Sequence, residues 1–113
     1  MGGSTVIRSY REFWPYYLNE HRRPETRALH LAGTGAATAL LAAGVVAANP
    51  WLLTAAVLAG YGPAWFAHYA VEKNTPATFR YPVWSLISDF RMAGTWLAGG
   101  LHRELERAGI AER

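Results

Sequence analysis

The sequence contains no cysteine, which excludes disulfides, iron–sulfur clusters and thiol catalysis. Charged residues make up only 17% of the chain, and the basic ones form no dense run. Tracking a nucleic-acid backbone requires a clustered basic face, so we expect no nucleic-acid partner. The first residues lack an apolar stretch of signal-peptide length, and we therefore expect no cleaved leader. Internal repeats and low-complexity tracts are absent too.

Two common catalytic motifs are also missing. The closely spaced glycines, Gly33 with Gly35 and Gly99 with Gly100, lie inside helical stretches and lack the strand–turn–helix context of a phosphate-binding loop. No Ser-His-Asp pattern with a recognisable nucleophile turn occurs. The sequence therefore indicates neither a nucleotide-binding loop nor a serine hydrolase.

Strongly apolar stretches alternate with charged ones. The chain has 113 residues, which is enough for one domain over residues 1–113 and too few for two. It is 51% apolar, yet its mean hydropathy is close to zero because charged and polar residues offset the apolar ones, and the charged residues are gathered between apolar runs. This pattern is typical of an all-α membrane-embedded protein.

Two uncharged runs of equal length predict a membrane hairpin. Residues 28–48 would form about 31 Å of helix, against a hydrocarbon core of roughly 30 Å. Gly35, Ala39 and Ala43 recur at four-residue intervals there, which predicts a small-residue stripe for helix packing. Residues 51–71 form the second run, which we expect to be kinked or broken near Gly60 to Pro63. The short turn between the runs makes the two predicted spans antiparallel.

Basic residues flank this hairpin on one side only. Arg22, Arg23 and Arg27 precede the first run, and Lys73 and Arg80 follow the second. Cytoplasmic segments of membrane proteins are enriched in such residues, so we expect an integral membrane protein with both termini in the cytoplasm.

Helices are predicted on both sides of the hairpin. Helical periodicity and the capping-box spacing of Ser9 and Glu12 predict an amphipathic helix over residues 5–21, suited equally to a membrane interface or to a soluble bundle. Pro82 is expected to start a long helix that runs to about Ala108. Its Asp89 and Arg91 would each cost roughly 3 kcal/mol at a bilayer centre. We therefore expect this helix to be partly interfacial or to face the bundle.

Histidines and one glutamate predict a metal site. His68 and Glu72 are four residues apart, so on a helix they lie one turn apart on the same side. His30 begins the first run at the depth where His68 ends the second, and the break at Pro24 allows His21 to approach both. These donors suit iron or another redox metal as well as zinc. The alternative for His68 and Glu72 is a polar pair that caps a span.

Two segments resemble a known family. FWPYYLNEHRRPETRALHLAGT and GYGPAWFAHYAVEKNTPATF are similar to the small membrane-protein family typified by the fungal 2-hydroxy fatty acid dioxygenase, over residues 10 to about 92. The resemblance implies an Fe(II)-dependent enzyme that uses dioxygen to shorten a 2-hydroxy fatty acid by one carbon. His21, His30 and His68 match the family's motif histidines, and Glu72 and Asn74 match its acidic and amide positions.

The enzyme hypothesis has several consequences and one rival. We expect metal ligation by His21, His30, His68 and Glu72, a catalytic role for Asn74, and binding of the substrate carboxylate by Lys73 or Arg27. The substrate tail would remain among membrane lipids. The sequence does not determine the oligomeric state and is compatible with a homo-oligomer. The alternative is a non-enzymatic membrane hairpin that acts in assembly or lipid binding and whose histidines only cap helices.

Overall fold

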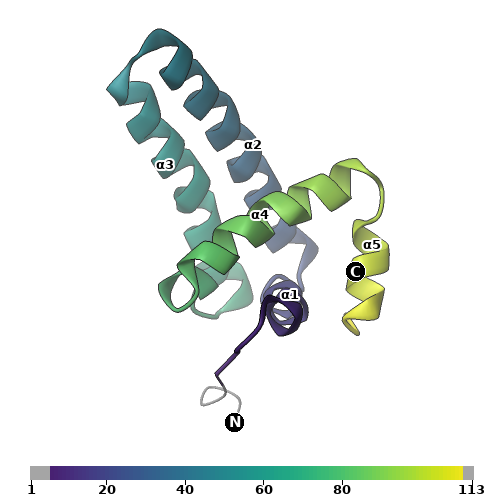
Figure 1. Cartoon of the computed structure of the whole chain (residues 1–113). Helices are drawn as coiled ribbons and strands as arrows, with labels where there is room; N and C mark the ends of the chain where they lie inside the picture. Colours follow the sequence, from purple (N-terminus) through teal and green to yellow (C-terminus); the bar gives the residue numbers. More distant parts are fainter. Residues whose placement is uncertain (1–5, 111–113) are drawn as a thin grey trace.

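Residues 6–110 are described by a computed structural model, in which this part of the chain is entirely helical and contains no strand (Figure 1). The predicted all-α class is therefore confirmed. The elements, in chain order, are α1 (Tyr10–Asn19), α2 (Pro24–Ala47), α3 (Pro50–Phe66), the π-helix η2 (Ala67–Glu72), the 3-10 helix η3 (Ala77–Phe79), α4 (Pro82–Leu97) and α5 (Leu101–Arg107).

Helices α2 and α3 form an antiparallel hairpin that projects from the rest of the molecule (Figure 1). Both helices begin at a proline, which has no N–H to leave unsatisfied in a first turn. Between them, Ala48 adopts a left-handed φ of 51°. The Asn49 side chain then accepts a hydrogen bond of 2.9 Å from the Trp51 N–H. The tight turn predicted at Asn49 and Pro50 is therefore present.

Small residues allow the two hairpin helices to approach closely, but they are not the predicted ones. A Cβ added to Gly33 would lie 2.9 Å from the Ala59 carbonyl oxygen, and one added to Gly44 would lie 2.7 Å from Leu53 Cδ2. The same addition at Gly35 meets nothing within 4 Å. The predicted stripe through Gly35 is thus wrong as the α2–α3 contact, because residue spacing does not reveal which face of a helix meets its partner.

One of the helices described, α2, is long and apolar enough to cross a membrane. The second predicted span, residues 51–71, is not confirmed as a continuous α-helix. Of the predicted kink or break near Gly60 to Pro63, the break is absent, since α3 continues through these residues to Phe66 with Pro63 inside it; the kink stays a prediction. The backbone then changes to the wider π-helix η2, a local irregularity that occurs frequently at functional sites.

Helix α1 is shorter than the predicted range of 5–21, and its aromatic face is covered by protein. Ser9 caps its first turn by accepting a hydrogen bond of 3.3 Å from the Glu12 N–H. This face packs against α4 and α5. The buried core comprises Phe13, Trp14, Tyr17, Leu18, Ala77, Met92, Leu101, Leu105 and Ile110.

The single long helix predicted from Pro82 to about Ala108 is wrong. Helix α4 ends at Leu97, and Gly99 adopts a φ of +80°, a conformation that glycine takes without steric cost. The chain therefore turns before α5, which places Leu101 and Leu105 in the core. The sequence predicts Gly99 and Gly100 inside a helix, whereas in the structure they follow the end of α4.

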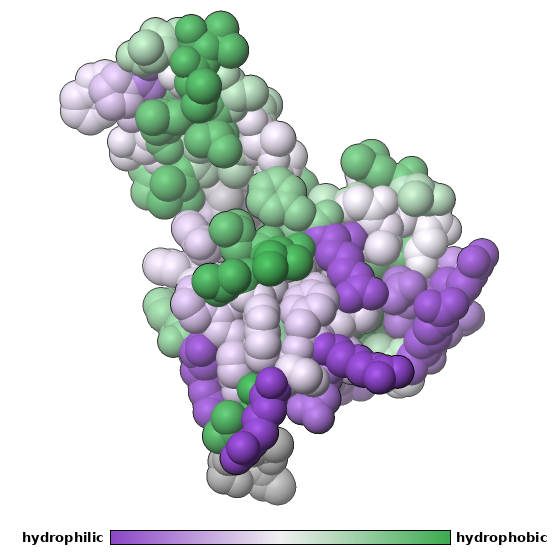
Figure 2. Space-filling model, viewed as in Figure 1, coloured by the Kyte–Doolittle hydropathy of each residue, from purple (hydrophilic) through white to green (hydrophobic). Residues whose placement is uncertain are grey.

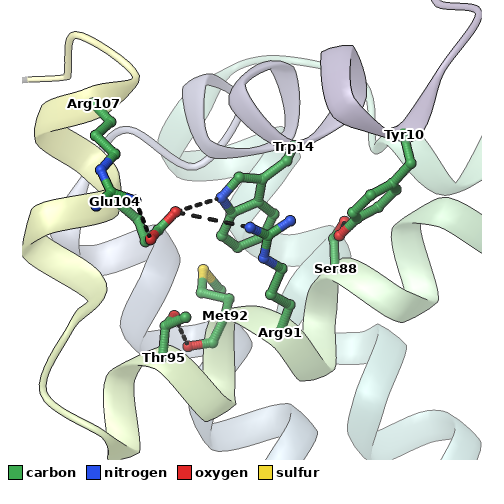
Figure 3. A network of polar contacts seen from close by, with 8 residues as sticks. All are labelled: Tyr10, Trp14, Ser88, Arg91, Met92, Thr95, Glu104 and Arg107. Carbon is green, nitrogen blue, oxygen red and sulfur yellow. Dashed lines mark hydrogen bonds and ion pairs between the residues drawn. The ribbon is translucent and has the colours of Figure 1, made fainter.

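Arg91 on α4 contacts residues of α1 and α5 (Figure 3). Its guanidinium carbon is 4.1 Å from the centre of the Trp14 ring, and its Nη2 is 3.9 Å from a carboxylate oxygen of Glu104. The same Glu104 oxygen accepts a hydrogen bond of 2.9 Å from Trp14 Nε1. These contacts hold three helices together and confirm that α4 faces the bundle at this position.

Hydrophobic side chains remain exposed on the far part of the hairpin and on α4. Figure 2 shows hydrophobic residues over the projecting end of the hairpin, and hydrophilic residues gathered at the opposite end of the molecule. Most of the large exposed hydrophobic residues lie on the hairpin or on α4, namely Leu41, Val45, Val46, Trp51, Val57, Leu58, Trp65 and Phe66 on the hairpin, and Val83, Leu86, Ile87, Phe90, Trp96 and Leu97 on α4; Val6, Tyr69 and Phe79 are exposed elsewhere.

Candidate metal centre

Three histidines from three different segments meet at the base of the hairpin. His21 lies in the turn between α1 and α2, His30 on α2 and His68 on η2, and all three are buried. The Nε2 atom of His30 is 3.0 Å from Nε2 of His21 and 3.2 Å from Nε2 of His68. One ring nitrogen from each of the three lies within 4.8 Å of the others, so together they could hold a metal ion.

The turn that carries His21 is held by a buried arginine. Arg27 is 6% exposed, and its Nη1 donates hydrogen bonds of 3.0 Å to the carbonyl oxygens of His21 and Arg22. Helix α2 starts at Pro24, so the chain changes direction between His21 and His30. This break brings the two rings together, although an unbroken helix would place residues nine apart on opposite sides.

The outer ring nitrogens of His21 and His68 each face a hydrogen-bond acceptor. Nδ1 of His21 is 2.6 Å from the Tyr17 carbonyl oxygen, which can only accept. Nδ1 of His68 is 2.7 Å from Oδ1 of Asn74, whose Nδ2 donates to the Glu20 carbonyl oxygen at 3.2 Å. Because the Asn74 amide nitrogen is used by Glu20, its oxygen faces His68. Both histidines therefore carry their proton on Nδ1.

His30 has an acidic residue on its outer side. Nδ1 of His30 lies 3.4 Å from Oδ1 of Asp89, which also accepts a hydrogen bond of 2.5 Å from the Tyr17 hydroxyl. Burial raises the pKa of Tyr17 well above its usual value, and Asp89 raises it further, so the phenol stays protonated and donates. An ionised carboxylate in this position favours the His30 tautomer with the proton on Nδ1.

Sequence reasoning missed the part that Asp89 plays here. It counted the aspartate only as an energetic penalty on α4. The signal was present, because an ionisable residue in the middle of an apolar helix is by default a functional candidate.

In the tautomer that carries the proton on each outer nitrogen, the three inner Nε2 atoms have free lone pairs with which to bind a metal ion. Burial lowers the pKa of His21 well below its usual value, and the neighbouring His30 and His68 lower it further, which keeps this imidazole in the neutral form that binds metals. Three converging lone pairs are favourable only around a cation. Adjacent nitrogen ligands on a metal with bonds of about 2.1 Å are separated by roughly 3.0 to 3.4 Å. The distances of 3.0 and 3.2 Å match that range.

The other predicted site residues lie around this group. The Glu72 carboxylate accepts a hydrogen bond of 2.6 Å from the Arg23 backbone N–H, which ties η2 to the start of α2. Exposed Lys73 follows η2 with a φ of 63° and, with Arg22, borders an open hollow. His102 is exposed on α5 and lies outside the three-histidine group. Direct ligation by Glu72 and carboxylate binding by Lys73 remain predictions.

A small cavity and a larger apolar groove adjoin the histidines. The cavity has about 10 Å³ of free space, close to the room needed by one water molecule. A groove of about 300 Å³ runs along the hairpin from Thr34 to Leu41 on one wall, with α3 and α4 as the others. Tyr61 and Asp89 line both spaces, so the groove adjoins the cavity beside the three histidines.

Searches of curated proteins and of solved structures found no match. One family model matches residues 7–101, which include all three histidines, Asn74 and Asp89, and its description names a dioxygenase of a 2-hydroxy acid. The matched range covers most of the chain and extends the resemblance seen in the sequence at both ends. The chain therefore belongs to the Mpo1-like family, described as 2-hydroxy-palmitic acid dioxygenase Mpo1-like.

Proposed function

We propose that this protein is an Fe(II)-dependent membrane dioxygenase that shortens 2-hydroxy fatty acids by one carbon. The observation that carries the proposal is the convergence of three imidazole nitrogens, each with its opposite ring nitrogen facing an acceptor. Such a donor set suits a redox metal, and the family description supplies the reaction class. When bound, iron would supply the redox chemistry that lets dioxygen react with a closed-shell acid.

The overall reaction balances without a further reductant. Dioxygen oxidises the 2-hydroxy acid, the bond between C1 and C2 breaks, and the products are the acid one carbon shorter, carbon dioxide and water. In this proposal His21, His30 and His68 hold the metal, and Asn74 and Asp89 fix the orientation of two of the rings. Asn74 is thus a positioning residue, although the sequence had suggested a catalytic one.

Glu72 and the cations are assigned by their contacts. Because the Glu72 carboxylate already accepts from the Arg23 N–H, we place it as a residue that positions η2 and not as a ligand. The Arg27 guanidinium already donates to two backbone carbonyls. Of the two cations predicted to bind the substrate carboxylate, Lys73 is therefore the one retained.

The groove supports a substrate with a long alkyl chain. It begins at Tyr61 and Asp89 beside the metal centre and ends among exposed apolar side chains such as Leu41 and Val57. His30 and Leu41 are separated by about 16 Å along the axis of α2. A chain that leaves the metal centre along this groove would remain on an apolar surface throughout.

The exposed apolar surface supports a membrane location. Helix α2 could cross a bilayer, and most of the large exposed hydrophobic side chains lie on the hairpin and α4, with hydrophobic residues covering the projecting end of the hairpin (Figure 2). We propose that the hairpin is embedded with its turn away from the cytoplasm, and that the basic residues near the metal centre lie on the cytoplasmic side.

The test uses two histidine variants of the full-length protein in membranes. His68→Ala should lose bound iron and the dioxygen-dependent shortening of 2-hydroxypalmitic acid, measured by metal analysis and mass spectrometry. His102→Ala, which changes an exposed histidine outside the group, should keep both. Iron-loaded wild type that shortens no 2-hydroxy acid would refute the substrate assignment. Wild type that binds no metal would favour the non-enzymatic hairpin protein.

A further inference from the structure

Ser85 on α4 is buried beside the metal centre and has no hydrogen-bond partner there. It is 2% exposed, and its Oγ makes no hydrogen bond to any of the residues from 6 to 110. It lines the small cavity together with the three histidines, Tyr61 and Asp89. A buried hydroxyl without a partner is unfavourable, and native proteins rarely keep one without a reason.

The hydroxyl could have been satisfied locally but is not. Serine and threonine in helices often donate to the carbonyl four residues earlier. Thr38 does so to Thr34 at 2.8 Å, and Thr54 does so to Pro50 at 3.1 Å. Ser85 makes no such bond, although its backbone N–H bonds the Tyr81 carbonyl oxygen at 2.8 Å in the ordinary helical way. Its hydroxyl therefore remains available to the cavity.

A second buried serine on the same helix provides the contrast. Ser88 is 0% exposed, and its Oγ lies 2.9 Å from the Tyr10 hydroxyl, so it is satisfied by a contact between α4 and α1 (Figure 3). Ser88 is absent from the cavity lining, which includes Ser85 and Asp89, four residues apart and hence on one side of α4. Ser88 thus has a structural partner, whereas Ser85 faces the site.

The surroundings indicate which ligand atom the hydroxyl would meet. No lysine or arginine is among the residues that line the cavity, while the carboxylate of Asp89 lies one turn from Ser85. A substrate carboxylate placed here would face a like charge, but a neutral hydroxyl would not. The free space of about 10 Å³ suits a single oxygen atom and not a chain, and the alkyl groove begins next to it at Tyr61.

We propose that Ser85 binds the 2-hydroxyl group of the substrate and thereby selects 2-hydroxy acids over unsubstituted fatty acids. This inference rests on the proposed function, since it takes a long-chain 2-hydroxy acid as the ligand. The serine hydroxyl is both a donor and an acceptor, so it can pair with a hydroxyl in either direction. An acid without this group leaves Ser85 unpaired, and sites built around a hydroxyl discriminate strongly for that reason.

The experiment compares Ser85→Ala with Ser88→Ala and uses two ligands, 2-hydroxypalmitic acid and palmitic acid. Binding is measured on the metal-loaded protein without dioxygen, by thermal shift and by competition with a fluorescent fatty acid. Ser85→Ala should bind 2-hydroxypalmitic acid about ten-fold more weakly and palmitic acid unchanged. Its metal-free thermal midpoint should be unchanged or higher, because an unpaired buried hydroxyl has been removed.

Ser88→Ala should show the opposite pattern. It loses the bond to Tyr10, so its metal-free thermal midpoint should fall, while its preference for the 2-hydroxy acid persists. Equal binding of the two acids by wild type, or equal weakening of both in Ser85→Ala, would overturn the inference and leave Ser85 as the partner of a buried water. Because binding is read without turnover, a wild type that binds selectively but shortens no acid would refute the proposed function alone.

Discussion

Replacing Asp89 by asparagine should weaken metal binding while leaving the fold intact. The substitution keeps the shape of the side chain and an oxygen that can accept from the Tyr17 hydroxyl, now 2.5 Å from Asp89 Oδ1. It removes the negative charge that lies 3.4 Å from Nδ1 of His30. Loss of such a partner of a metal-bound histidine typically reduces metal affinity about 10- to 100-fold.

The magnitude can be read as a change in metal-dependent stabilisation. At a free Fe(II) concentration of about 100 times the wild-type Kd, binding stabilises the wild type by about 2.7 kcal/mol. A variant that binds about 10-fold more weakly keeps about 1.4 kcal/mol of this, and one that binds about 100-fold more weakly keeps about 0.4 kcal/mol. For a chain of 113 residues, each kcal/mol corresponds to a shift in Tm of roughly 4 °C.

The assay is the difference in Tm with and without Fe(II) under anaerobic conditions. Glu104→Gln is the matched control, because Glu104 also accepts from an aromatic side chain, Trp14, at 2.9 Å, but it takes no part in the three-histidine group. Its metal-dependent shift should equal that of the wild type. An Asp89→Asn protein with a full metal-dependent shift would show that Asp89 does not act on His30, and the tautomer reasoning would fail with it.

Two further predictions concern the groove and the membrane. Leu41→Trp places a large side chain at the end of the groove farthest from the histidines, so it should lower kcat/KM for 2-hydroxypalmitic acid by about 10-fold or more but spare 2-hydroxyoctanoic acid. Leu58→Trp, at an exposed position outside the lining, should affect neither acid, and equal loss on both acids in Leu41→Trp would contradict a tail site. Since the chain has no cysteine, Asn49→Cys gives a single labelling site at the hairpin turn. In sealed vesicles that expose the cytoplasmic face, this cysteine should be protected from a membrane-impermeant maleimide until detergent is added. Labelling in intact vesicles would place the turn on the cytoplasmic side.

The sequence by itself determined the class of structure and the three histidines that could hold a metal ion. Helical periodicity, Pro24, Pro50 and Pro82 at helix starts, and the long uncharged runs follow from local backbone chemistry, and local rules are readable from one chain. The convergence of His21, His30 and His68 was also predictable, because the antiparallel hairpin sets two of them at one depth and a proline redirects the third.

Only the tertiary structure decided which faces meet and what each polar group contacts. The α2–α3 contact uses Gly33 and not Gly35, and the chain turns back at Gly99, because such choices depend on partners that are distant in sequence. Asp89 acquires its role from Tyr17 and His30, and Ser85 is distinguished from Ser88 only by the absence of a partner. Residue spacing fixes which side chains share a helix face, but hydrogen bonding between segments far apart in the chain is a property of the folded molecule.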